Sequence, residues 1–416
     1  MKIQTSYYGP FGGQFIPEFL YPAITELENT FQAAIKDKTF LSEFNRLLRE
    51  YVGRPTPLYF AKNTSEFVGC RVYFKREDLN NGGSHKINNA IGQALLAKRM
   101  GKKIIITETA AGMHGVVTVM AANVVGLKTR VYMGVKDIKR QKINAEKIKL
   151  LGGEIIPVTR GSGVLKDAVS EALVAWIREL PVTHYLIGSA VGPHPFPTIV
   201  AYFQKVIGEE TLAQILKTEN RLPKTIIACG SGGSNALGIF KAFIKDNNVK
   251  LVFVEGGPTK SVQISQVPQS LALQSNHAAA LTFGSIGIFQ GSKTILLQDE
   301  YGMDRKTESR SAGLNYPARG PELAFYHSIG RVKATYATDQ EVLDAYLKMA
   351  SMEGLLPAFE TCHALAELFK RKGKYKRDDI VILNFSGRGD KDMETAMQLL
   401  NSKSETRNSN SFKNVF

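Results

Sequence analysis

Residues 74–89 read FKREDLNNGGSHKINN, and this stretch decides the fold. Its first residues complete an aromatic and β-branched run over Arg71–Glu77, which predicts a buried strand. Two glycines follow, and an amphipathic pattern then predicts a helix over Lys86–Met100. A strand, a glycine loop and a helix in this order form the repeating unit of a parallel α/β sheet.

The same alternation recurs through most of the chain. Similar runs predict strands at residues 104–108, 130–133, 154–158, 184–188, 225–229, 251–255 and 380–386, with helices between them, for instance at 141–151 and 165–180. This pattern predicts an α/β fold with mostly parallel sheets in two doubly wound domains. We place one domain at residues 53–204 and the other at 1–52 plus 205–400, and we expect the polar tail at 401–416 to be disordered.

Composition limits the class of protein. The 416 residues are 44% hydrophobic and 22% charged, which is typical of a folded globular chain. No apolar run reaches the ~18 residues of a membrane span, and the first residues lack the apolar region of a secretory signal. Cys70, Cys229 and Cys362 lie far apart, so neither a disulfide framework nor a zinc site is indicated. We expect a reduced, cytoplasmic protein without a membrane partner.

The net charge of +15 leaves two interpretations open. Such an excess attracts nucleic acid, or it forms a solvated basic surface. The run KRKGKYKR at Lys370–Arg377 is the densest basic segment, but no known nucleic-acid-binding motif accompanies it. We therefore expect a solvated surface and no nucleic acid.

Ligands of open α/β sheets bind beyond the carboxyl ends of the strands, so the loops there carry the candidate chemistry. Lys86 lies in the first turn of its predicted helix, where the positive end of the helix dipole favours a neutral amine. Such an amine can form a Schiff base with an aldehyde cofactor. Taken alone, a surface lysine on an amphipathic helix is the alternative.

A second loop, ETAAGMHG at 108–115, again joins a strand to a helix. Free backbone amides at that point bind an anion such as a carboxylate, and Glu108 would face the crevice as a general base. The alternative is a tight turn in which Glu108 is a solvated charge.

A third loop, ACGSGGSNALG at 228–238, is rich in glycine and predicts a phosphate cradle. It is not a Walker A loop, because no Gly-Lys-Ser/Thr follows. It is also a poor dinucleotide fingerprint, because Asn235 stands where the third glycine should be.

The fourth loop, FSGRGDKD at 385–392, would point the Ser386 hydroxyl into the crevice, although a charged turn is the alternative. A serine hydrolase is unsupported, because no GxSxG elbow occurs. Together the four loops suit pyridoxal phosphate and an amino-acid substrate. If Ser386 is the partner of the ring nitrogen, the pyridine stays largely unprotonated, which favours β-elimination through an aminoacrylate over transamination.

Nine motifs between about Tyr8 and Leu400 together resemble the β chains of tryptophan synthase, a family of fold-type-II pyridoxal phosphate enzymes. They read YYGPFGGQFIPE, GRPTPL, KREDLNNGGSHKINNAIGQ, ETAAGMHGVV, YMGVKDIKRQK, GGSNALG, SAGLNYP, EGLLPAFE and SGRGDKD. The resemblance implies a carbon–oxygen lyase that condenses L-serine with indole. It also implies a homodimer and an α subunit that supplies indole, and it admits a monovalent cation beside the cofactor.

The resemblance also implies roles for individual residues. Lys86 is then the Schiff-base lysine and Glu108 the acid/base. The cofactor would be bound by His85, Lys86, Ser231, Gly232, Gly233, Ser234, Asn235, Glu353 and Ser386. The substrate would be bound by Thr109, Ala110, Ala111, Gly112, Met113, His114, Asn315 and Arg140. A mobile subdomain would span about residues 101–189, with Lys166 facing the α subunit.

Several residues depart from the family pattern. Met113 stands in place of glutamine, Ser231 in place of a glycine, and Asn315 in place of an aspartate that pairs with the arginine matched by Arg140. We expect the Asn315 contact to be neutral and weaker by roughly a factor of two. Arg310 and Arg319 flank the SAGLNYP motif, which makes phosphoserine a candidate donor. The loop at 258–276 is expected to be longer than usual.

We therefore predict a diverged tryptophan synthase β-type enzyme. One alternative is a paralog that uses another nucleophile or another donor, such as threonine or phosphoserine. Another is a serine or threonine deaminase. Outside the enzymes, a catalytically silent scaffold or a basic binding module remains open.

Overall fold

The computed structural model describes residues 6–161, 163–258 and 276–401, so the predicted tail and nearly all of the 258–276 loop lie outside the described residues. The larger sheet has six strands, in the order β13 (Val332–Ala337), β10 (Lys250–Gly256), β9 (Thr225–Cys229), β14 (Ile380–Phe385), β4 (Arg71–Arg76) and β3 (Leu58–Phe60). Its neighbouring strands are parallel except for the β3–β4 pair at one edge.

A smaller sheet is wholly parallel. Its strands follow the order β7 (Glu154–Val158), β6 (Lys128–Gly134), β5 (Ile104–Glu108) and β8 (Thr183–Tyr185). A third, antiparallel sheet joins β1 (Tyr7–Tyr8), β2 (Phe11–Gly12), β12 (Ser292–Leu296) and β11 (Ser285–Phe289). The sequence patterns predicted the strands of the smaller sheet and β4, β9, β10 and β14, but not β3, β13 or the antiparallel sheet.

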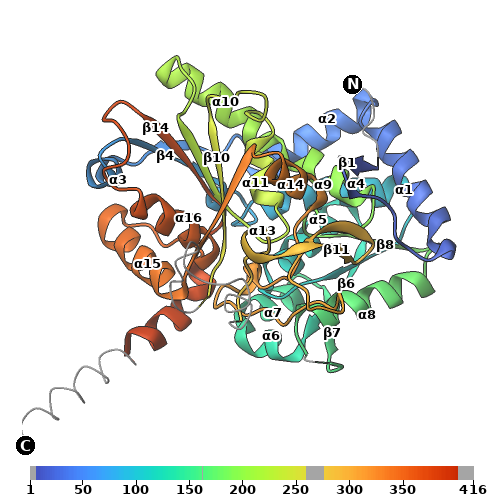
Figure 1. The fold of residues 1–416 in the computed structure, drawn as a ribbon. Helices are drawn as coiled ribbons and strands as arrows, with labels where there is room; N and C mark the ends of the chain where they lie inside the picture. Colours follow the sequence, from blue (N-terminus) through green and yellow to red (C-terminus); the bar gives the residue numbers. More distant parts are fainter. Residues whose placement is uncertain (1–5, 162, 259–275, 402–416) are drawn as a thin grey trace, which may run out of the picture.

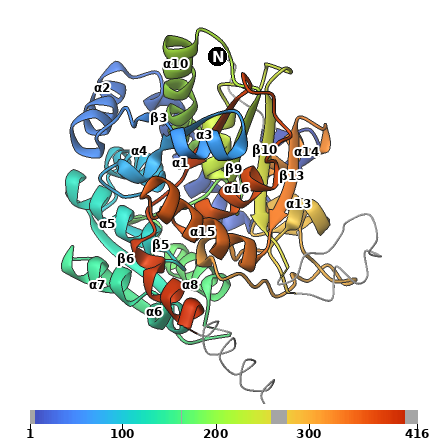
Figure 2. The same cartoon turned by 90° about the vertical axis from the view of Figure 1, so that its left-hand side faces the viewer.

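Helices cover both large faces of the six-stranded sheet. Helix α16 packs on one face and α11 on the other, and Figure 2 shows α15 and α16 in front of the strands. The first half of the chain has α1 (Tyr21–Ala34), α2 (Lys38–Leu47), α3 (Lys62–Val68), α4 (Lys86–Arg99), α5 (Met113–Val125), α6 (Val135–Arg140), α7 (Lys142–Leu150) and α8 (Leu165–Arg178). The second half has α9 (Phe196–Gln204), α10 (Val206–Glu219), α11 (Ser234–Phe240), α13 (Ala280–Phe283), α14 (Pro321–Ser328), α15 (Asp339–Glu353) and α16 (Phe359–Lys370).

Helix α4 connects the two parallel sheets. It leaves the carboxyl end of β4 in the larger sheet and packs against α5, which lies on the smaller sheet (Figure 1). Eleven of its fourteen residues are buried, so it is the common core of both halves rather than a surface helix. The one-sided amphipathic pattern expected for Lys86–Met100 is therefore replaced by burial nearly all round.

The sheets do not divide the chain as the predicted domains do. Strand β4 falls within the predicted domain at 53–204, yet it pairs with β14 along its whole length in the sheet of the other half. The smaller sheet draws all its strands from residues 104–185. A sequence pattern reports that a strand is buried but not which strand it pairs with, and for this reason the expected boundary at 53 is wrong.

Candidate active site

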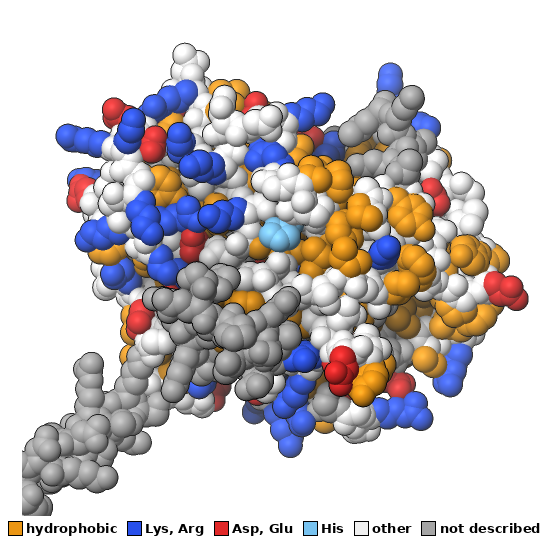
Figure 3. All heavy atoms as spheres, in the orientation of Figure 1, with side chains coloured by type: hydrophobic (Ala, Val, Ile, Leu, Met, Phe, Trp, Pro, Cys, Tyr) orange, Lys and Arg blue, Asp and Glu red, His pale blue; other side chains and the backbone are white. Residues whose placement is uncertain are grey.

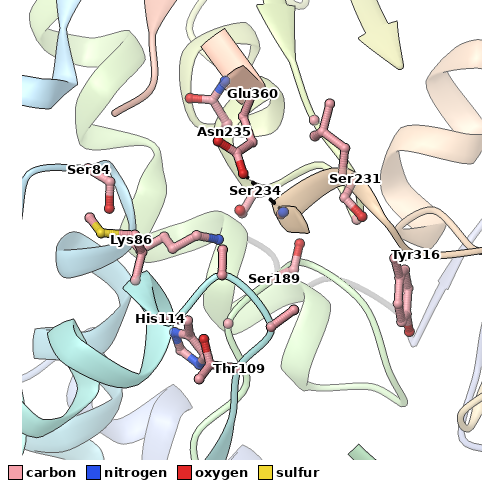
Figure 4. Close-up of a pocket in the computed structure, with 18 of the residues that line it drawn as sticks. Ser84, Lys86, Thr109, His114, Ser189, Ser231, Ser234, Asn235, Tyr316 and Glu360 are labelled. Carbon is pink, nitrogen blue, oxygen red and sulfur yellow. Dashed lines mark hydrogen bonds between the residues drawn. The ribbon is translucent and has the colours of Figure 1, made fainter. Parts of the chain in front are cut away.

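The four predicted loops meet in one pocket of about 1100 Å³, including its open mouth. It lies where the carboxyl ends of β4, β9 and β14 face those of β5 and β8. Figure 4 shows the Lys86 amine pointing to its middle, with Ser231 and Tyr316 across from it. The predicted residues that line it are His85, Lys86, Glu108, Thr109, Ala110, Ala111, Met113, His114, Ser231, Gly232, Gly233, Ser234, Asn235 and Ser386.

Lys86 opens α4 and has a free amine. No group in the described part of the chain donates to or accepts from its Nζ, which reaches the pocket instead. Burial lowers the pKa of this amine, although the nearest carboxylate, Glu360, opposes that shift. A lowered pKa raises the share of the neutral, nucleophilic amine.

The residues before Lys86 are tied to the loop after β14. The His85 ring lies 3.2 Å from the Ser386 carbonyl through Nδ1 and 3.2 Å from Ser234 Oγ through Nε2. The His85 backbone N–H donates to the same Ser386 carbonyl. Burial lowers the pKa of His85 to about 3, so the ring is neutral and acts as a spacer between three of the loops.

The glycine loop comes close to the opposite wall. A Cβ on Gly232 would stand 2.4 Å from Ser189 Oγ, so no larger residue fits there. The Asn235 side chain donates from Nδ2 to the Cys229 carbonyl at 2.9 Å and accepts from Asn384 at 2.8 Å. Its amide therefore holds the loop in shape and is not free for a ligand.

Glu108 ends β5 and is almost fully buried. Burial raises its pKa to about 7, and a hydrogen bond from the Tyr185 hydroxyl opposes the rise. One carboxylate oxygen, Oε2, has no hydrogen-bond partner in the described residues. A carboxyl group with a pKa near neutrality can both release and accept a proton, as a general acid/base must.

The loop after Glu108 is held from behind by α7. Asn144 donates from Nδ2 to the Ala111 carbonyl at 2.7 Å, and a Cβ on Gly112 would lie 2.2 Å from Asn144. Gly112 has a φ of +78° and, unlike its neighbours, does not line the pocket. The His114 ring turns back to Thr107 Oγ1 at 2.9 Å and is neutral, because burial lowers its pKa to about 3.

Ser386 is oriented by a residue that the sequence did not single out. Thr361 on α16 is fully buried, and its Oγ1 lies 2.9 Å from Ser386 Oγ. Cys229 Sγ stands on another side of the same hydroxyl at 3.5 Å. Thr361 directly follows Glu360, the last residue of the EGLLPAFE motif. This position could have indicated Thr361, but only if Glu360 had been identified as the pocket residue of the motif.

The expectation for Glu353 is wrong, because Glu353 does not line the pocket. Its carboxylate accepts from Thr64 on α3 and from Tyr59 on β3, the edge strand of the larger sheet. The glutamate at the pocket is Glu360, seven residues later in the same motif. Gly313 N–H donates to it at 3.0 Å and Lys391 at 2.9 Å, and the Lys391 ammonium holds the pKa of Glu360 below its ordinary value.

The residues expected around Asn315 are placed differently as well. Asn315 and Arg140 do not line the pocket; Arg140 pairs with Asp137, and Asn315 Oδ1 has no partner in the described residues. Arg319 is fully buried and paired with Glu255 at 2.7 Å. Arg310, half exposed, lies 3.7 Å from Asp339. Because these charges are already compensated, the structure offers no arginine cluster for a phosphoserine.

An ion pair crosses from α8 to the loop after β12. Lys166 Nζ lies 2.6 Å from Asp304 Oδ1, while Leu165 and Val169 beside it line the pocket. Within residues 6–161, 163–258 and 276–401, no cluster of three His, Cys, Asp or Glu side chains could hold a metal ion. No helix in this part of the chain is long and apolar enough to cross a membrane.

Comparison with known proteins agrees with this geometry. The family described as pyridoxal-phosphate dependent enzyme matches residues 50–387. Tryptophan synthase beta chain 1 of Methanosarcina acetivorans is 50% identical over 392 residues, which cover 94% of this chain and 96% of that protein.

Solved structures share the fold. A threonine deaminase from T.th. is 19% identical with a TM-score of 0.61, covering 86% of this chain and 97% of that one. Maize serine racemase is 17% identical with a TM-score of 0.62, covering 87% and 98%. The fold is therefore that of the fold-type-II pyridoxal phosphate enzymes. The chain belongs to the tryptophan synthase β-chain family of pyridoxal-phosphate-dependent lyases, and pyridoxal phosphate is its cofactor.

Proposed function

We propose that this enzyme joins L-serine to indole, giving L-tryptophan and water. The observation that carries the proposal is the convergence of a free Lys86 amine, a near-neutral Glu108 and a glycine cradle in one pocket. The relative that is 50% identical is named for tryptophan synthesis, which supports the choice of substrates.

The residues fit pyridoxal phosphate. There is no space for a Cβ at Gly232, and because glycine has no side chain, the backbone of this loop stays open to a phosphate. Ser234 of the same loop also lines the pocket. The Lys86 amine has no protein partner in the described residues and suits an aldehyde, and the Ser386 hydroxyl suits the ring nitrogen. When bound, the cofactor supplies the electron sink that stabilises negative charge at the substrate Cα.

The protein side chains supply the proton transfers. Lys86, whose lowered pKa favours the neutral amine, takes the proton from Cα of serine and returns it to Cα once indole has been added. Glu108 gives a proton to the departing serine hydroxyl and then, as a carboxylate, accepts one from the ring of the incoming indole. The loop at residues 109–114 would bind the substrate carboxylate, and Glu360, which lines the pocket, would make the cofactor contact expected of Glu353.

The exposed apolar surface supports the protein partners that we propose. Figure 3 shows apolar side chains gathered on the half of the drawn face where β11 lies. Ile286 and Ile288 of β11 and Tyr7 of β1 are exposed apolar residues. Such a surface supports association as a homodimer and with an α subunit. The basic side chains lie mostly on the other half, and in the Lys370–Arg377 run Arg371 pairs with Glu367 and Lys372 lies over Phe67. We place the reaction in the cytoplasm, because the cysteines are unpaired thiols.

The experiment supplies purified protein and pyridoxal phosphate with serine alone, with indole alone and with both. We expect a yellow protein, a serine-dependent spectral change, and tryptophan by mass spectrometry only when both substrates are present. Serine consumption that yields pyruvate and no tryptophan would replace the proposal with a deaminase. No spectral change and no product would favour a silent scaffold.

A further inference from the structure

The pocket contains a side chain that the reaction scheme leaves without a role. Gln290 forms the turn of the β11–β12 hairpin together with Gly291 and lines the pocket. Its φ is +45°, in the left-handed region, and Gly291 follows with +86°. A turn of this type favours asparagine or glycine at its first position, so a glutamine there is strained. Strain of this kind gathers at binding and catalytic sites.

The surrounding chain fixes the position of this turn. Phe15 N–H donates to the Gly291 carbonyl at 3.0 Å, which ties the turn to the first segment of the chain. Phe289 stacks edge to face on Tyr316, with ring centroids 5.6 Å apart. The Gln290 side chain is therefore held at the pocket by contacts on both sides of its backbone.

Tyr316 sets the direction of the glutamine amide. Its hydroxyl donates to Gln290 Oε1 at 2.5 Å, which directs Nε2 away from the tyrosine. Burial and the nearby Glu108 raise the pKa of Tyr316 well above its ordinary value, so this hydroxyl keeps its proton and remains the donor. Nε2 has no hydrogen-bond partner in the described residues, it is not a fully buried atom, and Gln290 lines the cavity. The pair thus offers two amide hydrogens to a ligand.

The neighbouring wall is apolar. Leu165 and Val169 of α8 and Leu314 line the same pocket and suit a flat hydrocarbon ring. A donor at an otherwise apolar wall fixes the orientation of a ligand and selects for an acceptor atom on it.

We propose that Gln290, oriented by Tyr316, determines which nucleophile is used. Its Nε2 donates a hydrogen bond to an acceptor atom on the incoming ring, so the enzyme favours indole-like rings that carry a hydroxyl group over purely apolar ones. This inference rests on the proposed function, because it concerns the nucleophile of that reaction.

The test uses isomeric hydroxyindoles, each matched with the methylindole substituted at the same ring position. The two members of a pair have nearly the same size, so their ratio isolates the hydrogen bond. For the holoenzyme with serine we measure kcat/KM for every pair. Calorimetry without serine gives the binding constants of the same compounds. The variants are Gln290→Met, which keeps the length of the side chain, and Tyr316→Phe. Gln290→Asn shortens the side chain by one methylene and so moves the amide away from the ligand. Because asparagine tolerates the left-handed backbone, this variant still tests the inference if the methionine variant fails to fold. Lys293→Met in the same hairpin is the control.

We expect the hydroxyl-to-methyl ratio of at least one pair to fall about tenfold in Gln290→Met and Gln290→Asn. In Tyr316→Phe it should fall about threefold, because the amide is then free to turn. It should stay unchanged in Lys293→Met. A fall of less than threefold in both Gln290 variants for every pair overturns the inference.

The two readouts separate this inference from the proposed reaction. If adducts form and the ratios do not respond, the reaction stands and the role of Gln290 is wrong. If no adduct forms with any nucleophile, the reaction is wrong, and the binding ratios alone decide whether Gln290 recognises the hydroxyl group.

Discussion

The two sides of the pocket are built differently. On the cofactor side, formed by residues 84–86, 229–235 and 386, the buried side chains of His85, Asn235 and Ser386 are hydrogen-bonded to neighbouring loops or helices. On the acceptor side, formed by residues 113, 165, 290, 314 and 316, Gln290 Nε2 has no hydrogen-bond partner in the described residues. An ion pair between Lys166, which is half exposed, and Asp304 closes that side.

We infer from this difference that the cofactor side controls the chemical steps and the acceptor side controls the choice of nucleophile. A bonded, buried network fixes its atoms before a ligand arrives, so a change there should affect cofactor and rate. A side with a free donor can be altered without disturbing the network, so a change there should affect which nucleophile is used. Substitutions on the two sides should therefore differ in whether they change the rate or the choice of nucleophile.

The largest effect is expected from Lys86→Ala on the cofactor side. We expect kcat to fall on the order of 10⁴-fold, because both the covalent attachment and the Cα proton transfer are lost. Borohydride reduction followed by mass spectrometry measures the covalent cofactor, and Lys98→Ala, an exposed lysine on the same helix, is the control. Covalent cofactor in the Lys86→Ala protein would mean that another lysine has this role.

Glu108→Gln should lower kcat on the order of 10²–10³-fold and should also change the pH dependence of stability. Burial raises the Glu108 pKa from 4.5 to about 7, so between these values the folded protein holds a proton that the unfolded chain has lost. The free energy of unfolding therefore falls as pH rises through this window. Glutamine cannot ionise, so the variant does not lose this part of the free energy of unfolding as pH rises.

Urea unfolding of the cofactor-free protein measures this second effect. Near pH 8 the Glu108→Gln variant should be more stable than the wild type, by at most about 3 kcal/mol. Near pH 4.5 the two proteins should have nearly equal stability. An equal gain at both pH values would show that Glu108 titrates normally.

The cofactor side was largely predictable from the sequence and the acceptor side was not. Glu108 ends a strand, and Lys86, Gly232 and Ser386 lie in segments that follow strands. Because the carboxyl ends of parallel strands meet, local patterns placed these residues in one pocket. Glu353 and Glu360 are the first and last residues of one motif, EGLLPAFE, so the motif alone does not distinguish them. Only the direction of α16 decides which of them reaches the pocket.

Residues of the acceptor side come from elements whose pairing the sequence does not encode locally. Gln290 reaches the pocket through an antiparallel hairpin that strand patterns missed, because β11 is exposed on most of its length. Arg319 looked like a free charge beside Asn315, yet Glu255, 64 residues away, neutralises it. Pairings over such distances along the chain depend on the tertiary fold.

A moderate effect is expected from Thr361→Val. Valine has the shape of threonine but cannot hydrogen-bond to Ser386, and a bond of this kind contributes about 1 kcal/mol. The affinity for pyridoxal phosphate, measured by equilibrium dialysis, should therefore fall about fivefold. Thr361→Ser keeps the hydroxyl and should bind the cofactor as the wild type does. Wild-type affinity in the valine variant would place Ser386 outside the cofactor contact.

The smallest effect is expected from Asp304→Asn. The Lys166 side chain is 47% exposed, and an ion pair with such an exposed partner contributes only about 0.2–1 kcal/mol. The KM for serine should rise no more than about threefold at low ionic strength, and the difference should vanish at high salt, because screening already removes the attraction in the wild type. Lys166→Met should give the same result, and the double variant should add nothing further, because both changes break one contact. A larger, salt-independent effect would mean that the acceptor side is as rigid as the cofactor side.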